Sequence, residues 1–218
     1  VFFVFRKNRL KNGPGEAEPA GRFKFRWALP ALFCGALPAS AASFVMATLR
    51  EPHGKWDAWW IWNFHARFIY RSGEAWRGMF TEGLDWTHLD YPLLVPLSVV
   101  RSWQYAGGET LQAPVLLAGL FTFAAAGAVC AALALLRGRN QGFLGGLVLM
   151  GTPFFVVLGA AQFADIPLAL LFLLSFVFVF LHARDAAGGN GLLVLAGLAA
   201  GLAAWTKNEG LLFFILFV

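Results

Sequence analysis

The sequence predicts an all-α, polytopic transmembrane protein, and three observations support this fold class. Of the 218 residues, 59% are hydrophobic and 13% are charged, whereas soluble domains average about 45–50% and 25%. The mean hydropathy is +0.64. The charged residues stand between uncharged runs, and each complete run is long enough to cross a hydrocarbon core of ~30 Å, which takes about 20 helical residues.

These runs predict five complete spans and a truncated sixth, in one membrane-embedded domain at 27–218. In chain order they lie at about 27–49, 112–136, 142–164, 166–183, 188–206 and, in part, 210–218. A basic arm at 1–26 comes before the first span, and a long hydrophilic loop at 50–109 comes after it. Because the last run is cut off at Val218 and the chain begins with Val1, we expect the sequence to be part of a longer protein.

Lysine and arginine predict the orientation, because both are enriched in short cytoplasmic loops. The arm at 1–26 has many more bases than acids, so we place it inside the cell. Alternation then places Arg137 and Arg139 inside, and the loop 50–109, Asp165 and Lys207 outside. We therefore expect a multi-pass protein of a bacterial inner membrane. A pI of about 9.6 fits a basic arm against anionic headgroups, and we predict no nucleic-acid partner.

The loop 50–109 is predicted to do more than connect two spans, because helix connections usually take about 2–8 residues. It contains most of the tryptophans and every tyrosine: Trp56, Trp59, Trp60, Trp62, Trp76, Trp86, Trp103, Tyr70, Tyr91 and Tyr105. Such rings favour the membrane interface, where an apolar body and a polar tip are both satisfied. Their helical spacing predicts an amphipathic interfacial helix over 57–71.

Asp57 lies near the start of that predicted helix, and two interpretations of it are open. Aspartate is a favoured N-cap, which accepts a hydrogen bond from an unpaired helix amide. The residue three positions on is Trp60 rather than Glu or Gln, so the sequence has no capping box. The alternative is a catalytic carboxylate surrounded by indole rings.

The other candidate residues also map to the predicted outer face, and each has a structural alternative. His88 and Asp90 could be two ligands of a divalent cation or a proton-transfer pair, or could form a structural hydrogen bond. Asp165 could be functional, or could be a turn residue that reaches water before Pro167. Lys207 and Glu209 could form an interfacial salt bridge. Together, polar residues on one face among aromatic rings suit a substrate with a lipid tail and a polar head.

Four blocks of sequence follow one another in the chain: "WDAWWIWNFHARFIY", "HLDYPLLVPL", "FADIPLALLFL" and "GLAAWTKNEGLL". In this order and spacing they resemble the C-type membrane glycosyltransferases, and specifically the bacterial branch similar to dolichyl-phosphate-mannose-protein mannosyltransferases. The resemblance covers most of 27–212. It implies that a sugar moves from a polyprenyl-phosphate carrier to an acceptor glycan, lipid or protein on the extracytoplasmic face. Direct displacement would invert the anomeric carbon.

The resemblance also implies residue roles. Asp57 matches the acid that acts as the base on the acceptor hydroxyl. A cation should stabilise the departing lipid phosphate, and Lys207 is our first choice, with Arg67 or Arg101 as substitutes. The remaining substrate-binding residues would be Asp165, His88, Asp90 and Glu209. A metal-free reaction is our default, with a divalent cation as the open alternative.

The sequence departs from the family pattern at one position and leaves two other functions open. Many protein mannosyltransferases have Asp and Glu side by side in the first loop, whereas Ala58 follows Asp57 here, which weakens the case for a protein acceptor. A transporter or lipid-linked sugar flippase would also have many spans. However, transporters tend to have internal repeats and midplane charges, which the predicted spans lack. A structural subunit of an envelope complex is the third class.

Overall fold

The computed structural model describes residues 27–184 and 189–217, and this part of the chain is helical without strands. It therefore confirms the predicted all-α class, while the basic arm at 1–26 lies outside the described residues. The helices are α1 (Ala28–Arg50), a π-helix η1 (Ala58–Trp62), α2 (Asn63–Ser72), the 3₁₀ helices η2 (Gly73–Phe80) and η3 (Glu82–Thr87), α3 (Leu94–Ala106), α4 (Gln112–Arg137), α5 (Arg139–Met150), α6 (Pro153–Ala160), α7 (Asp165–Arg184), α8 (Gly191–Ala204) and α9 (Asn208–Phe217).

Three helices are long and apolar enough to cross a membrane: α1 with 23 residues, α4 with 26 and α7 with 20. They coincide with the predicted spans at 27–49, 112–136 and 166–183. Each ends at an arginine, namely Arg50, Arg137 and Arg184. Such a residue suits a helix end, where its charge can reach water and complement the partial negative charge of the last carbonyls.

The predicted span at 142–164 is not one straight helix. The structure divides it into α5 and α6, which meet at 65°. Thr152 between them has an extended backbone, and Pro153 follows as the first residue of α6, so the hydrogen-bonding pattern of α5 cannot continue across the break. This pair would supply a fourth span if both helices belong to one crossing.

The predicted count of five complete spans is not confirmed. The span predicted at 188–206 corresponds to α8, which has 14 residues, and the partial span at 210–218 corresponds to α9, which has 10. Both are shorter than the roughly 20 residues that a complete crossing takes. The break between them consists of Trp205, Thr206 and Lys207.

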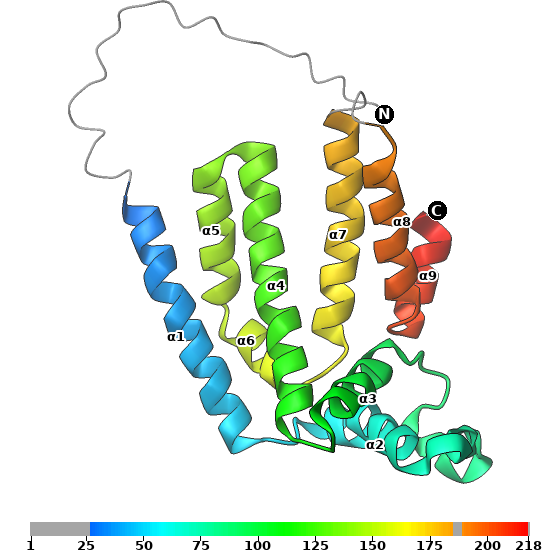
Figure 1. Ribbon diagram of the computed structural model, residues 1–218. Coiled ribbons are helices and arrows are strands. Elements are labelled where there is room, and N and C mark those ends of the chain that lie inside the picture. The colour runs from blue at the N-terminus through cyan, green and yellow to red at the C-terminus, as the bar shows by residue number, and fades with distance from the viewer. Residues whose placement is uncertain (1–26, 185–188, 218) are drawn as a thin grey trace, which may run out of the picture.

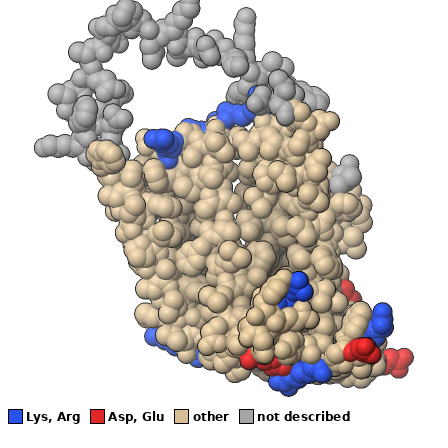
Figure 2. Space-filling view, in the orientation of Figure 1, with Lys and Arg blue, Asp and Glu red and all other residues tan. Residues whose placement is uncertain are grey.

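The long helices stand side by side, and residues 50–109 fold across one end of the bundle (Figure 1). We call this the loop end. Charged side chains gather at the two ends in Figure 2, basic ones at the opposite end and both signs at the loop end, with an almost uncharged surface between them. This distribution is compatible with a membrane protein whose apolar middle faces lipid.

The loop 50–109 forms a packed layer of its own. Where we predicted one helix over 57–71, the structure has the π-helix η1 followed by α2. Ile61 and Trp62 pack against Val95 of α3 and Ala164, and Ala66 packs against Trp103 in a second cluster. Burial of these apolar groups, at ~25 cal/mol per Å², fixes the layer to the bundle and positions the polar residues described next.

Candidate functional site

Lys207 is the centre of a polar cluster at the loop end. Its ammonium lies 3.3 Å from Asp165 Oδ1 at the start of α7 and 3.3 Å from Glu209 Oε1 in the first turn of α9. The Lys207 side chain is only 12% exposed, whereas those of Asp165 and Glu209 are 43% and 57% exposed. The turn between α8 and α9 thus holds a cation just below the surface between two carboxylates that water can reach.

Burial acts to lower the pKa of Lys207, but the negative charges of Asp165 and Glu209 outweigh it, so the net pKa is raised. Lys207 is therefore a permanent cation at neutral pH. The two acids hold its ammonium in place and contact two of its three N–H donors.

Asp90 and Asn208 extend this group. The Asn208 amide donates a 2.6 Å hydrogen bond to Asp90 Oδ2, which joins the loop layer to α9. Nearby, the backbone N–H of Leu94 donates to the carbonyl of Trp205 at 3.0 Å. We call the residues Lys207, Asp165, Glu209, Asn208 and Asp90 the Lys207 cluster.

His88 and Asp90 are neighbours, but they do not form the hydrogen bond that we considered. His88 Nδ1 lies 3.9 Å from Asp90 Oδ1, beyond hydrogen-bonding distance. Across 27–184 and 189–217, no three His, Cys, Asp or Glu side chains come together as a metal site. The structure therefore gives no geometric support to a divalent cation on this pair.

Tyr91 connects the cluster to the aromatic residues of η1. Its ring stacks with those of His88 and Trp62, with centroid distances of 5.1 and 5.3 Å, and Lys207 Nζ lies 5.6 Å from its centroid. Trp62 is 2% exposed, and its indole N–H has no hydrogen-bond partner in the described part of the chain. Such a buried, unpaired donor is rare in folded proteins and calls for a functional or solvent explanation.

Asp57 is linked to Tyr91 through η1, because it directly precedes that π-helix and Trp62 at the end of the helix stacks on Tyr91. Burial raises the pKa of the Tyr91 hydroxyl, the Lys207 ammonium lowers it, and the carboxylates of Glu209, Asp90 and Asp57 raise it further. These four charged groups come from three separate segments of the chain.

The capping interpretation of Asp57 is wrong, because its side chain makes no capping hydrogen bond. The residue stands immediately before the π-helix Ala58–Trp62 and is partly exposed. A π-helix is rare and is found mostly at functional sites. Ile61 and Trp62 at the end of this helix are buried, whereas Asp57 before it is reached by water.

The segment before Asp57 is fixed by close backbone packing against the turn between α6 and α7. Gly54 has φ +75°, and a Cβ there would stand 2.6 Å from the carbonyl oxygen of Ala161. The adjacent Lys55 N–H donates to that same oxygen at 3.1 Å. Glycine is needed here both for its backbone angle and for the lack of a side chain.

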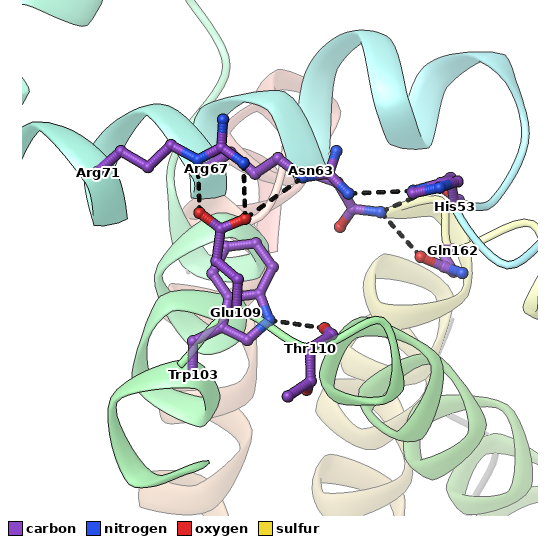
Figure 3. A network of polar contacts seen from close by, with 8 residues as sticks. All are labelled: His53, Asn63, Arg67, Arg71, Trp103, Glu109, Thr110 and Gln162. Atoms are coloured by element: carbon purple, nitrogen blue, oxygen red, sulfur yellow. Dashed lines mark hydrogen bonds and ion pairs between the residues drawn. The ribbon is translucent and has the colours of Figure 1, made fainter. Parts of the chain in front are cut away.

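A buried amide pair strengthens the same junction (Figure 3). The Asn63 side chain donates to Gln162 Oε1 at 2.8 Å and to the His53 carbonyl at 3.3 Å, and the Gln162 amide donates to the Pro52 carbonyl at 3.2 Å. Sequence reasoning missed Asn63, Gln162, Tyr91 and Asn208. A buried amide is invisible in a one-dimensional pattern, although "WN" inside an aromatic helix and "AQF" in an apolar turn mark polar groups that need partners.

Arg67, which we predicted as a substrate residue, lies in a different network. Its Nε is 3.9 Å from Glu109 Oε2, and its Nη2 is 3.2 Å from His53 Nδ1. Arg71 donates two hydrogen bonds to the same Glu109 carboxylate, at 2.6 and 2.9 Å, as Figure 3 shows. Burial lowers the pKa of Arg67, and Glu109 acts against this effect. The structure gives Arg67 a structural partner and does not place it in the Lys207 cluster.

Arg101 was the other residue that we predicted as a possible substitute for Lys207 at the phosphate. Its guanidinium carbon lies over the ring of Tyr105, 4.4 Å from the ring centroid.

No protein-family model, curated protein or solved structure matches this chain.

Proposed function

We propose that this chain is the catalytic membrane part of a glycosyltransferase that moves a sugar from a polyprenyl-phosphate carrier to an acceptor hydroxyl outside the cell. One observation carries the proposal: Tyr91 connects the two candidate residues, because its ring stacks on Trp62 of the π-helix that Asp57 precedes and lies 5.6 Å from Lys207 Nζ. A candidate base and a candidate phosphate-binding cation thus share one region at the end of an apolar bundle. A donor with a lipid tail and a charged head needs this combination.

In the proposed reaction, Asp57 accepts the proton of the acceptor hydroxyl as its oxygen attacks the anomeric carbon. The bond from that carbon to the phosphate oxygen breaks, and its electron pair stays on the phosphate, so the configuration inverts. The lack of a capping bond supports this role, because the carboxylate oxygens of Asp57 remain available.

Lys207 would stabilise the charge that grows on the leaving phosphate. Since Asp165 and Glu209 each lie 3.3 Å from its ammonium, which has three N–H donors, an incoming phosphate would bind the third donor or replace one of these contacts. The released carboxylate, already partly exposed, could then accept a hydrogen bond from a sugar hydroxyl. The unpaired indole N–H of Trp62 is a further donor that a substrate oxygen could satisfy.

The test compares two matched variants, Asp57→Asn and Asp85→Asn. Asp85 is an exposed acid of the same loop layer, in η3. Membranes that contain full-length protein would be incubated with a panel of labelled polyprenyl-phosphate hexoses, and transfer of the label would be measured. We expect Asp57→Asn to lose roughly 10²-fold or more and Asp85→Asn to stay within about twofold of wild type. Equal transfer by the two variants would remove Asp57 from the mechanism.

One observation favours a second candidate, a transporter or flippase for lipid-linked sugars. The 65° break between α5 and α6 resembles the discontinuous helices of transporters. A transporter would move the labelled lipid between leaflets of a proteoliposome without covalent transfer. The break is uncharged, since it consists of Gly151 and Thr152, so a coupling ion would find no ionisable ligand there.

A further inference from the structure

A groove at the end of α1 is separate from the Lys207 cluster. It is lined by eight residues: Arg50, Glu51, Pro52, His53, Gly54, Lys55, Trp56 and Trp59. Asp57 is not among the lining residues, although it lies between Lys55 and Trp59 in the chain. The groove is therefore a candidate site that the proposed reaction does not use.

The position of Arg50 indicates at which level of the bilayer the groove lies. Arg50 is the last residue of α1, whose 23 residues rise about 34 Å at ~1.5 Å each. If α1 crosses a hydrocarbon core of ~30 Å, its last turn reaches the phosphate level of the bilayer. The two rings that border the groove, Trp56 and Trp59, are exposed and meet edge to face at 4.8 Å. Exposed indoles at this depth are typical of a headgroup region.

The charges of the groove favour an anion. Arg50 and Lys55 stand against one acid, Glu51, and within the described ranges neither cation makes a side-chain hydrogen bond or ion pair. By contrast, Lys207 and Arg67 are both paired with acids. The groove thus offers the basic groups that an approaching phosphate can bind without first displacing a carboxylate.

An apolar path leads from the groove along α1. Leu49 is 75% exposed, and Val45 and Met46 on the preceding turn are also exposed. They lie on the membrane side of Arg50. A phosphate at Arg50 and Lys55 would therefore be followed, in the direction of the bilayer, by a surface suited to acyl chains.

We infer that this groove binds the phosphate of an anionic phospholipid from the leaflet at the loop end, held between Arg50 and Lys55 and bordered by Trp56 and Trp59. The bound lipid would hold the segment 50–55, and through the hydrogen bond from Lys55 to Ala161 it would also hold the turn that leads to Asp165. This role is independent of sugar transfer. It requires only that α1 spans the membrane.

Tryptophan quenching by brominated lipids tests the inference. The full chain would be reconstituted in vesicles of phosphatidylcholine that contain a small fraction of either brominated phosphatidylglycerol or brominated phosphatidylcholine. We expect the anionic lipid to quench more strongly, with a preference on the order of fivefold for each cation engaged. Trp56→Phe/Trp59→Phe should remove the excess quenching, which would locate it at the groove.

Charge variants complete the test. Arg50→Gln/Lys55→Gln should remove the preference, whereas Arg77→Gln/Arg101→Gln, which deletes the same charge elsewhere in the loop layer, should retain it. Equal quenching by the two lipids in wild type, or loss of the preference in both charge variants, would overturn the inference. Displacement of the brominated phospholipid by trace polyprenyl phosphate would also overturn it and assign the groove to the carrier lipid.

Loss of Arg50 and Lys55 should leave Asp57-dependent sugar transfer measurable, so failure of one proposal is distinguishable from failure of the other.

Discussion

The ammonium of Lys207 and the carboxylate of Asp165 lie 3.3 Å apart although 42 positions separate them in the chain. This ion pair joins the turn between α8 and α9 to the first residue of α7. Glu209 and Asp90 lie close by, so the cluster is rich in acid around one buried cation. Lys207 therefore has two tasks, to hold the end of the bundle together and, in the proposed reaction, to meet a phosphate.

Replacing Lys207 by Met removes the charge and keeps a side chain of similar length, so it tests both tasks without a large change in size. The substitution leaves Asp165 and Glu209 without a counter-ion, and we expect the free energy of unfolding to fall by about 1–2 kcal/mol, since both acids can still reach water. Sugar transfer should fall by a larger factor than the decrease in the amount of folded protein. Lys207→Arg is the control that keeps the charge, and it should retain stability. Thermal unfolding in detergent and transfer in membranes are the two measurements, and normal transfer by Lys207→Met would exclude it as the phosphate ligand.

Gly54 is predicted to be intolerant of any side chain. A Cβ at Gly54 would lie 2.6 Å from both the Ala161 carbonyl oxygen and the Ala58 Cβ, at a φ of +75°. Gly107 has nearly the same angle, +76°, but its Cβ would meet open space, so Gly107→Ala measures backbone strain alone. We expect about 1 kcal/mol for Gly107→Ala and at least about 2 kcal/mol for Gly54→Ala, by thermal unfolding. Equal losses would mean that the segment 50–55 can move away from α6.

Much of this fold could be predicted from the distribution of charge. Uncharged runs ended by arginine identified α1, α4 and α7, because a charge in hydrocarbon is costly and long apolar runs have few alternatives to a helix. The break at Pro153 could not be predicted from the presence of proline, because Pro38 lies inside α1 without interrupting that helix. Whether a proline breaks a helix depends on what satisfies the freed carbonyls, and this is decided by tertiary packing.

The candidate site could be predicted in part. Alternation of spans placed Asp57, Asp165 and Lys207 at one end, and the structure has them at the loop end. The contacts themselves could not be predicted, because the Lys207 to Asp165 distance depends on how α7, α8 and α9 pack. The π-helix could not be predicted either, because its one extra residue per turn leaves no trace in the hydrophobic pattern of "AWWIW".

His65 is expected to make the loop layer sensitive to acid. His65 is fully buried, and burial lowers the pKa of its imidazole to about 4. The unfolded chain titrates near 6.5, so between these values the unfolded state binds more protons and stability falls as the pH falls. The contribution of His65 to the free energy of unfolding is fully present above about pH 6.5. It is lost as the pH falls toward 4, and the total loss is at most about 3 kcal/mol.

The check is the free energy of unfolding from pH 7.5 to 4.5 in wild type and in His65→Gln. The variant keeps a polar group near Thr87, which lies 3.1 Å from His65 Nε2, but has nothing to titrate. We expect its pH dependence to be flatter over that range. The same slope in both proteins would show that another group is responsible.

Tyr91 allows the aromatic stack to be tested apart from its hydroxyl. Tyr91→Phe keeps the ring between His88 and Trp62, so its thermal unfolding should stay close to that of wild type. Tyr91→Leu removes both stacked contacts and the ring beneath Lys207, and we expect it to cost about 1–3 kcal/mol. In the proposed reaction Tyr91 lies beside the phosphate-binding Lys207, whose Nζ is 5.6 Å from the ring centroid, so Tyr91→Phe should lower sugar transfer while stability is kept. If Tyr91→Phe destabilises the protein as much as Tyr91→Leu does, the hydroxyl rather than the stack holds the loop layer to α9.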